Sequence, residues 1–210
     1  WYASAGIEPR LDLVPFADPA ILRHCEAESF CLRHFENVLY RQLRAGERVV
    51  AAGARPGIEI RLVDPGDDAE VRRYSEIAMS GFHPPGHVFA ETDFALSSRI
   101  VKHPRTRSFI ASVETESGVV DAGAGAIELH GETSCLFGLS TLPAFRRMGV
   151  QQTLIAARLN LAIEMGMRVS TISSRPGEGT ERNVRRMGFQ TAYTKAILVK
   201  SGPGLVPSQG

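Results

Sequence analysis

The sequence predicts a mixed α/β (α+β) fold, in which helices flank a central sheet. Hydrophobic residues make up 43% of the 210 positions, which is enough for a substantial core. From residue 58 to residue 199, the expected elements follow the order β-α-α-β-β-β-α-β-α-β. A short β-α-β pattern near the N-terminus also matches the last β-α-β unit, which indicates an internal repeat.

The two similar units span residues 10–30 and 168–189, so their lengths differ by one residue. Chance similarity of short units is the alternative, but the agreement in spacing favours a degenerate repeat. We expect a partial repeat copy and linker in residues 1–55, a main domain in 56–201 and a flexible tail in 202–210. Because residue 1 is Trp rather than Met, we also expect the natural chain to begin earlier. In the two units, the expected strands cover 10–16, 32–43, 168–173 and 191–199, and the helices 19–27 and 179–187.

The main domain is predicted from local signals. Asp67 stands where a helix N-cap is expected, before a helix that extends to about Met79. A longer helix, from about Met148 to Met165, carries an apolar stripe and should pack against the sheet. The stripe consists of Val150, Leu154, Ala157, Leu161 and Met165, widened by Ile155 and Leu159. The remaining elements are strands over 58–63, 108–113, 119–129 and 133–141 and a helix over 93–101.

Charge and cysteine content exclude several classes of function. The net charge of +1 gives no reason to expect a nucleic acid or an anionic membrane as a partner. No apolar run is long enough to span a bilayer, and no signal peptide is visible. Cys25, Cys31 and Cys135 are scattered without metal-ligand spacing, so we expect free thiols in a reducing, cytoplasmic setting. His83 and His87 lack a third ligand at a useful spacing, so we expect no metal. A monomer or homodimer is expected.

The most informative segment leads from a strand end into the long helix. Its basic pair, Arg146 and Arg147, stands beside a first helical turn without Asp or Glu. Cations there destabilise the helix start by roughly 0.3–1 kcal/mol each, because they oppose the helix dipole. A bound anion would instead interact favourably with the dipole. Gly149 lets the backbone approach a ligand closely. The alternative, a solvent-exposed basic turn, is equally supported by this loop alone.

Two common phosphate-binding motifs are excluded. The loop lacks the Gly-Lys-Ser/Thr of a Walker A site and the three glycines of a dinucleotide fingerprint. The Gly123-Ala124-Gly125 segment fails the same test and lies in an expected strand, where small residues more often indicate close packing.

Three features carry a resemblance to a known family: the loop Arg146-Arg147-Met148-Gly149-Val150-Gln151, the order of the strands and the closing Gly188-Phe189. Together they resemble the GCN5-related N-acetyltransferase (GNAT) superfamily, over residues 58–200. The loop pattern of this family is Arg/Gln-x-x-Gly-x-Gly/Ala, and Gln151 replaces its last small residue. The resemblance implies a mostly antiparallel sheet, acetyl-CoA as co-substrate and an amine acceptor. The acceptor pocket would be built around residues 70–105.

The resemblance also implies roles for individual residues. Gly138 would be a bulge residue, followed by strand residues that pair with the pantetheine arm, and Asn183 would lie near that arm. Arg182, Arg185 and Arg186 form a basic helix face, which is usually solvated but could contact a nucleotide phosphate. The implied pantetheine residues are Leu139, Ser140 and Thr141, and the implied pyrophosphate residues are Arg146, Arg147, Met148, Gly149, Val150, Gln151 and Gln152.

Catalytic residues are less well defined. An attacking amine with a pKa near 10.4 must lose a proton, which costs about 4–5 kcal/mol at pH 7. The family often uses a Glu on the strand before the loop, but residues 133–138 contain no acid. The available substitutes are Glu128, His83, His87 and Glu91, for each of which a solvated surface role is the alternative.

The leaving thiolate raises the same difficulty. Many relatives protonate it with a Tyr, but Val184 occupies the matching position. Tyr193 could serve, or it could simply pack on the sheet. Cys135 could carry an acyl group, or it could fill a small buried apolar space.

The sequence therefore predicts an acyl-CoA-dependent N-acyltransferase that transfers acetyl to a primary amine. Antibiotic amines, small metabolites, peptide N-termini and Lys side chains all remain open as acceptors. A non-catalytic acyl-CoA-binding sensor or regulatory module is the alternative, and an interaction domain that has lost the ligand is a third hypothesis.

Overall fold

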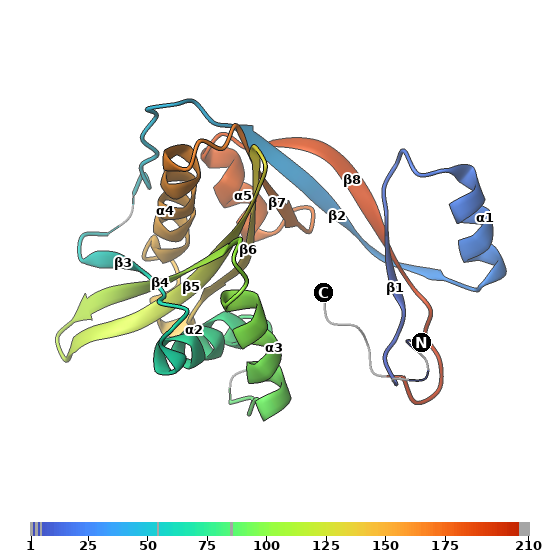
Figure 1. The fold of residues 1–210 in the computed structure, drawn as a ribbon, viewed down its shortest axis with the longest axis horizontal. Helices are drawn as coiled ribbons and strands as arrows, with labels where there is room; N and C mark the ends of the chain where they lie inside the picture. The colour runs from blue at the N-terminus through green and yellow to red at the C-terminus, as the bar shows by residue number, and fades with distance from the viewer. Residues whose placement is uncertain (1, 3, 5, 54, 85, 206–210) are drawn as a thin grey trace.

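The computed structural model describes residues 2, 4, 6–53, 55–84 and 86–205. Its strands form one eight-stranded sheet in the order β1-β8-β2-β7-β6-β5-β4-β3 (Figure 1). The strands are β1 (Arg10–Leu13), β2 (Cys31–Gln42), β3 (Ile58–Leu62), β4 (Thr106–Thr115), β5 (Gly118–His130), β6 (Thr133–Thr141), β7 (Val169–Ser174) and β8 (Gln190–Val199). The helices are α1 (Pro19–Ala27), α2 (Asp68–Ser80), α3 (Glu91–Val101), α4 (Val150–Glu164) and α5 (Gly179–Arg186), with a 3₁₀ turn η2 (Pro143–Phe145).

The predicted order of elements from β3 to β8 is confirmed, as is the mixed, mostly antiparallel sheet. Among the described strand pairs, β6 and β7 are parallel and the others antiparallel. Asp67 caps α2 as predicted, because its carboxylate accepts the amide hydrogens of Ala69 and Glu70. None of the helices in the described parts of the chain combines the length and apolarity needed to cross a bilayer.

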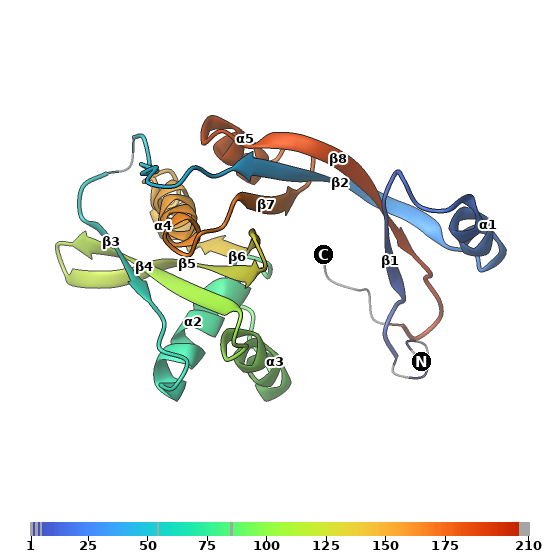
Figure 2. The same ribbon diagram turned by 45° about the horizontal axis from the view of Figure 1, so that its top comes forward.

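Helices cover the sheet on both faces: α2 and α3 on one, α4 and α5 on the other (Figure 2). The alternation of β4 explains this arrangement. Phe109 and Ala111 belong to the cluster that includes α4, whereas Ile110 belongs to the cluster under α2. Each face of the central strands is therefore buried under its own helical layer.

The buried face of α4 differs from the predicted stripe. Val150, Leu154, Ile155 and Leu159 are buried as expected, but Met165 at the end of the stripe is 50% exposed. The segment before β3 covers a second side of the helix. There the side-chain amide of Asn160 bonds both the N–H and the C=O of Val49, at 2.8 and 3.0 Å. A helix covered on two sides buries more than one stripe, and its buried face includes a charged residue, Arg158.

The N-terminal unit is built into the sheet. Strand β2 lies between β7 and β8, antiparallel to both, while β1 pairs with the other edge of β8. The pairing is reciprocal, since Cys31 at the start of β2 faces Val199 at the end of β8, and Tyr40 faces Gln190. The two β-α-β units therefore exchange strands, and β1 and β2 share one sheet with the strands of the predicted main domain. Descent from a duplicated copy stays a prediction.

One part of the sheet extends away from the rest, and we call it the arm. It consists of residues 10–36, which include β1, α1 and the first half of β2, together with residues 195–199 of β8. Figure 1 shows α1 and β1 far from the layered remainder, which we call the body. Within α1, Cys25 is the buried residue.

Candidate functional site

A groove opens where β6 leaves its neighbour β7. The parallel ladder between them runs from Thr133↔Val169 to Leu136↔Ile172 and ends there. On the other side of β6, the register slips between Ala126↔Phe137 and Ala124↔Ser140, so β6 carries an extra residue. The bulge expected at Gly138 is confirmed, with a φ of +60°. It bends β6 and frees the backbone edge of residues 139–141.

The loop after β6 ends in an unusual helix start. Gly149 is the N-cap of α4 with a φ of +94°, and Arg147, a non-glycine residue, has a φ of +63°. In the described chain, no side chain caps α4 and no acid lies in its first turn. The first-turn amides are therefore left for a ligand, and together with the helix dipole they favour an anion.

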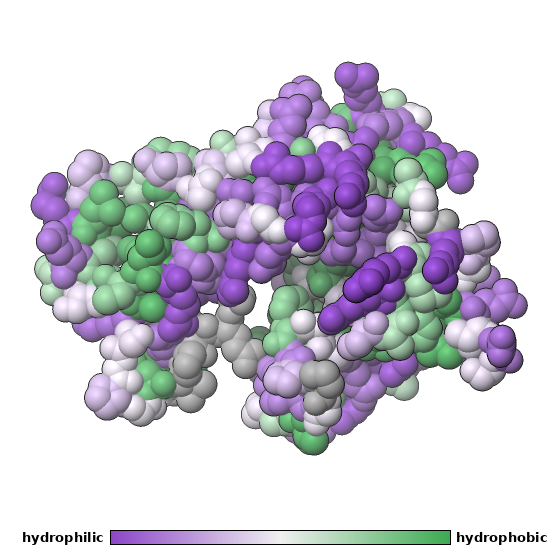
Figure 3. All heavy atoms as spheres, turned by 180° about the vertical axis from the view of Figure 1, so that it is seen from behind, coloured by the Kyte–Doolittle hydropathy of each residue, from purple (hydrophilic) through white to green (hydrophobic). Residues whose placement is uncertain are grey.

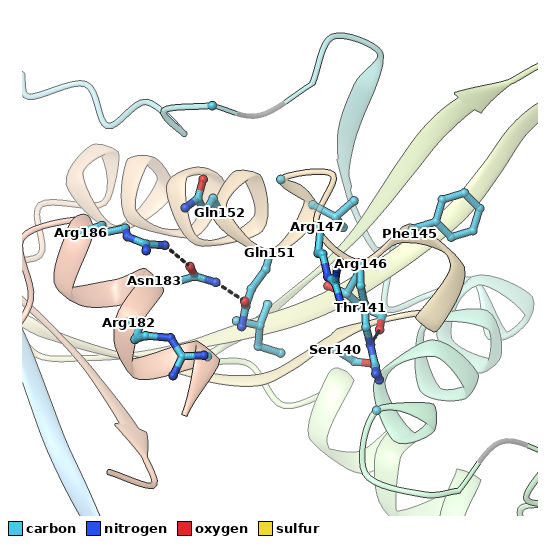
Figure 4. Close-up of a pocket in the computed structure, with 16 residues that line it drawn as sticks. Ser140, Thr141, Phe145, Arg146, Arg147, Gln151, Gln152, Arg182, Asn183 and Arg186 are labelled. Carbon is cyan, nitrogen blue, oxygen red and sulfur yellow. Dashed lines mark hydrogen bonds between the residues drawn. The ribbon is translucent and has the colours of Figure 1, made fainter. Parts of the chain in front are cut away.

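The groove and the helix start line one cavity of about 670 Å³ (Figure 4). The residues predicted for the cofactor come together there, except Met148, which packs against the main core. The lining residues are Gly53, Gly81, Leu139, Ser140, Thr141, Phe145, Arg146, Arg147, Gly149, Val150, Gln151, Gln152, Gly179, Arg182, Asn183 and Arg186.

The cavity is strongly basic. Four arginines line it, and no carboxylate of the described residues does. Arg146 and Arg147 come from the loop, whereas Arg182 and Arg186 come from α5. Arg185 instead pairs with Glu181 at 2.8 Å, so the three arginines of the basic face have different roles. A basic, partly enclosed cavity attracts a phosphorylated ligand.

Gln151, the departure from the family pattern, connects α4 to α5. Its Nε2 donates to the hydroxyl of Thr180 at 3.0 Å, and its Oε1 accepts from the amide of Asn183. Arg186 in turn donates to Asn183 (Figure 4). The side-chain N–H of Asn183 is thus bonded to Gln151, and the two helices that line the cavity are held together.

A second set of bonds fixes α5 from the side of the N-terminal unit. Asn37 on β2 donates to Glu181 at 3.0 Å, and the amide of Gly177 donates to the same carboxylate at 2.6 Å. Glu181 is 7% exposed, and the Gly177 amide together with Arg185 holds its pKa below the usual range. Strand β2 therefore supports the helix that carries Arg182 and Arg186.

Two hydroxyls beside the groove are suited to a ligand. The Oγ of Ser140 and the Oγ1 of Thr141 are buried without a hydrogen-bond partner among the described residues. Gly81, the C-cap of α2, lies against Ser140, because a Cβ there would be 2.4 Å from its Oγ. Unpaired buried hydroxyls are costly, and a bound polar chain such as pantetheine could satisfy Thr141 or Ser140.

The predicted catalytic residues lie away from this cavity. Glu128 is 43% exposed and pairs with Arg105 at 3.5 Å. Tyr193 packs edge-on against Phe16, with 5.2 Å between ring centroids. Neither residue lines the cavity, so their catalytic roles stay predictions. Val184 is fully buried.

Other candidates take positions that the sequence did not indicate. The expectation of a buried Cys135 was wrong, because its side chain is exposed and lines a second cavity of about 340 Å³ together with Glu128. His83 and His87 stack on each other, with 4.2 Å between ring centroids, and Glu91 begins α3. Among the described residues, no group of three or more His, Cys, Asp and Glu side chains could hold a metal.

Comparison with known proteins gives a result for structure and none for sequence. No protein-family model and no curated protein matches the sequence. Among solved structures, a GCN5-related N-acetyltransferase from Sphaerobacter thermophilus has 17% identity and a TM-score of 0.67, covering 96% of this chain and 64% of that one. One from Kribbella flavida has 17% identity and a TM-score of 0.69, with 97% and 72% covered.

A third similar structure is a tandem GNAT protein from the clavulanic acid biosynthesis pathway. It has 13% identity and a TM-score of 0.61, and the match covers 92% of this chain and 64% of that one. The chain thus spans between 64% and 72% of the length of these three structures. Strand order, bulge and helix start agree with the likeness, and the chain has the fold of the GCN5-related N-acetyltransferases.

Proposed function

We propose that this chain is an acyl-CoA-dependent N-acyltransferase that transfers acetyl from acetyl-CoA to a primary amine. One observation carries the proposal: an uncapped, basic helix N-terminus and the open edge of β6 line the same cavity. The first feature suits a pyrophosphate and the second suits an amide-bearing chain, and acyl-CoA contains both.

Each part of the cavity has a distinct task in binding. The amides of the first turn of α4 would hold the pyrophosphate, with Gly149 allowing the close approach. Arg182 and Arg186, which line the same cavity, would bind a further phosphate. The backbone of residues 139–141 would pair with pantetheine as an added strand does. These contacts would orient the thioester toward the end of the groove.

The reaction is a direct transfer. The amine nitrogen attacks the thioester carbonyl, a C–N bond forms, the C–S bond breaks, and the amine proton is lost while the thiolate gains one. Orientation supplies much of the rate, because it turns an encounter of two molecules into a reaction within one complex. The predicted roles of Glu128 as base and Tyr193 as acid remain part of the proposal.

Titration calorimetry with acetyl-CoA, followed by an assay of CoA-thiol release on a panel of amines, tests the proposal. Gly149→Glu should abolish binding, because it puts a negative charge at the helix N-terminus. Gly131→Glu is the matched control, since Gly131 also has a positive φ, of +56°, but does not line the cavity. Its variant should bind acetyl-CoA as the wild type does.

The outcomes separate the hypotheses. Binding with no thiol release on any amine would replace the enzyme with a non-catalytic acyl-CoA-binding module. A wild-type chain that does not bind acetyl-CoA would overturn the proposal entirely.

A further inference from the structure

A charged side chain lies in the core of the body, next to the bulge of β6. Arg158 on α4 is 0% exposed. Its Nε donates to the carbonyl of Leu154 at 3.0 Å, within its own helix. Its Nη1 donates to the carbonyls of Ala126 at 3.0 Å and Phe137 at 3.3 Å. Among the described residues, the partners of Arg158 are these three carbonyls and no carboxylate, and its Nη2 has no hydrogen-bond partner.

Such a charge is expensive to keep in a core. Burying an ion without a counter-ion costs several kcal/mol, and a hydrophobic residue of similar volume is often equally or more stable. Burial lowers the pKa of Arg158 to about 10, so the guanidinium remains charged at neutral pH. Leu or Met would serve packing alone better than Arg does. The presence of Arg at this position therefore points to a role for its hydrogen-bond donors.

The two carbonyls that Arg158 binds on β5 and β6 indicate this role, because both belong to the bulge. Ala126 and Phe137 face each other at the point where the β5–β6 register slips. A bulge disrupts the ladder and leaves backbone groups to find other partners. Arg158 bridges the two strands there with one nitrogen.

The surrounding residues make room for this contact. Gly125 lies against the guanidinium, since a Cβ at this position would be 3.1 Å from the Cζ of Arg158. From the α2 side, the hydroxyl of Tyr74 lies 3.3 Å from where a Cβ on Gly138 would be. The bulge is thus held between two helices, by Arg158 on one face and Tyr74 on the other.

We propose that Arg158 is a positioning residue, which fixes the β6 bulge so that residues 139–141 present their backbone edge to acyl-CoA. The inference rests on the proposed function for its ligand, but the fixing of the bulge does not. Without Arg158, the carbonyls of Ala126 and Phe137 would lose a charged donor, and the edge of β6 beyond the bulge would become mobile.

The test compares Arg158→Met and Arg158→Lys in the full chain. Arg168→Met is the matched control, because Arg168 is 73% exposed and pairs with Glu132 at the surface. In the absence of ligand, Arg158→Met should reduce amide-exchange protection of residues 137–141 about tenfold, the loss expected from one charged hydrogen bond. Protection in β4 should be unchanged. Lys keeps the charge and one donor, so its variant should recover part of the protection.

Ligand measurements complete the test. For Arg158→Met, the Kd for acetyl-CoA and the KM for it should rise by about the same tenfold factor, whereas kcat for bound substrate should fall less. If Arg158→Met does not fold, the partial effect of Arg158→Lys at residues 137–141 decides the question.

Three results are informative in different ways. Equal loss of protection across the whole sheet would show a merely structural role and overturn the inference. Unchanged protection at residues 137–141 would also overturn it. A wild type that does not bind acetyl-CoA, together with a local loss of protection in Arg158→Met, would overturn the proposed function and leave the fixing of the bulge standing.

Discussion

The body and the arm share one sheet, yet different forces hold them together. In the body, helices cover both faces of the sheet, and Leu154, Ile155 and Leu159 of α4 have no exposed surface. In the arm, Phe16, Leu32 and other apolar side chains are largely exposed. Seen from behind, hydrophobic atoms gather on the surface of the arm (Figure 3). Packing therefore stabilises the body much more than it stabilises the arm.

Ion pairs partly take the place of packing in the arm. Lys195 on β8 pairs with Asp12 on β1 at 2.6 Å and with Glu36 on β2 at 3.1 Å. Burial would raise the pKa of Asp12, but hydrogen bonds from Lys195 and Arg10 hold it below its usual value. A continuous backbone ladder can therefore join regions whose stabilities respond to different conditions.

The largest expected effect is a core truncation in the body. Leu154→Ala should lower the free energy of unfolding by about 2–5 kcal/mol, because it leaves a cavity between α4 and the sheet. Leu32→Ala in the arm, where the side chain is 53% exposed, should change it by less than about 0.5 kcal/mol. Urea unfolding measures both. Similar losses for the two variants would contradict the contrast between body and arm.

The link between the N-terminal unit and the cavity should give the next largest effect. Asn37→Ala removes the amide that donates to Glu181 and accepts from Thr194, at a cost of about 1–3 kcal/mol. It should also weaken acetyl-CoA binding, because α5 carries Arg182. Calorimetry of this variant is compared with Tyr40→Phe, which removes only an exposed hydrogen bond to Gln190. Unchanged affinity in Asn37→Ala would show that β2 does not support the site.

Acid should loosen the arm before the body. The folded-state pKa values of Asp12 and Glu36 are lowered, so their stabilising contribution is present above about pH 4, the unfolded values, and is lost as the pH falls through the folded values. Amide exchange at pH 6 and pH 3.5, corrected for intrinsic rates, should show protection lost in β1 and β8 first.

Lys195→Met should loosen the arm already at pH 6 and reduce this acid dependence, with Arg10 still paired to Asp12 and Glu36. Lys102→Met, which removes an exposed pair with Asp68 in the body, should change neither. Equal acid dependence in Lys195→Met and the wild type would show that other groups are responsible.

The smallest effect concerns an aromatic contact between the arm and the neighbouring part of β8. Phe16 is 72% exposed and meets Tyr193 edge-on. Phe16→Ala should cost about 0.5–1.5 kcal/mol at most, the value of a single aromatic pair. Thermal unfolding measures it, and a larger loss would mean that the arm depends on packing more than its exposure suggests.

Local features of the body could be predicted from the sequence, because their causes are local. Asp67 fixes the start of α2 through its own side chain, and Gly138 allows the bulge through its own backbone freedom. The segment from Arg146 to Gln152 likewise predicted a basic helix start from its own residues. The cavity in which this segment and the bulged strand meet α5 could be identified only from the folded structure.

Other features depend on residues far apart in the chain. Arg158 looks like a surface residue of a helix, and its burial depends on carbonyls 32 and 21 positions away. The alternation of β6 would have placed Cys135 opposite the buried Leu136, so that signal was present and missed. Nothing local indicates that β2 lies between β7 and β8, because strand partners are chosen by the assembled sheet.

That placement of β2 sets an order of assembly. Asn37 and Thr194, which touch in the folded chain, are 157 residues apart, so β2 leaves the ribosome long before its partner β8 exists. Until then, at least one edge of β2 has unpaired backbone groups that another chain could bind. Synthesis that stops before β8 would leave β2 and α5 without their shared neighbour. Completion of the last strand therefore joins β1 to β2 through β8 and supplies Thr194 to Asn37, the residue that holds α5.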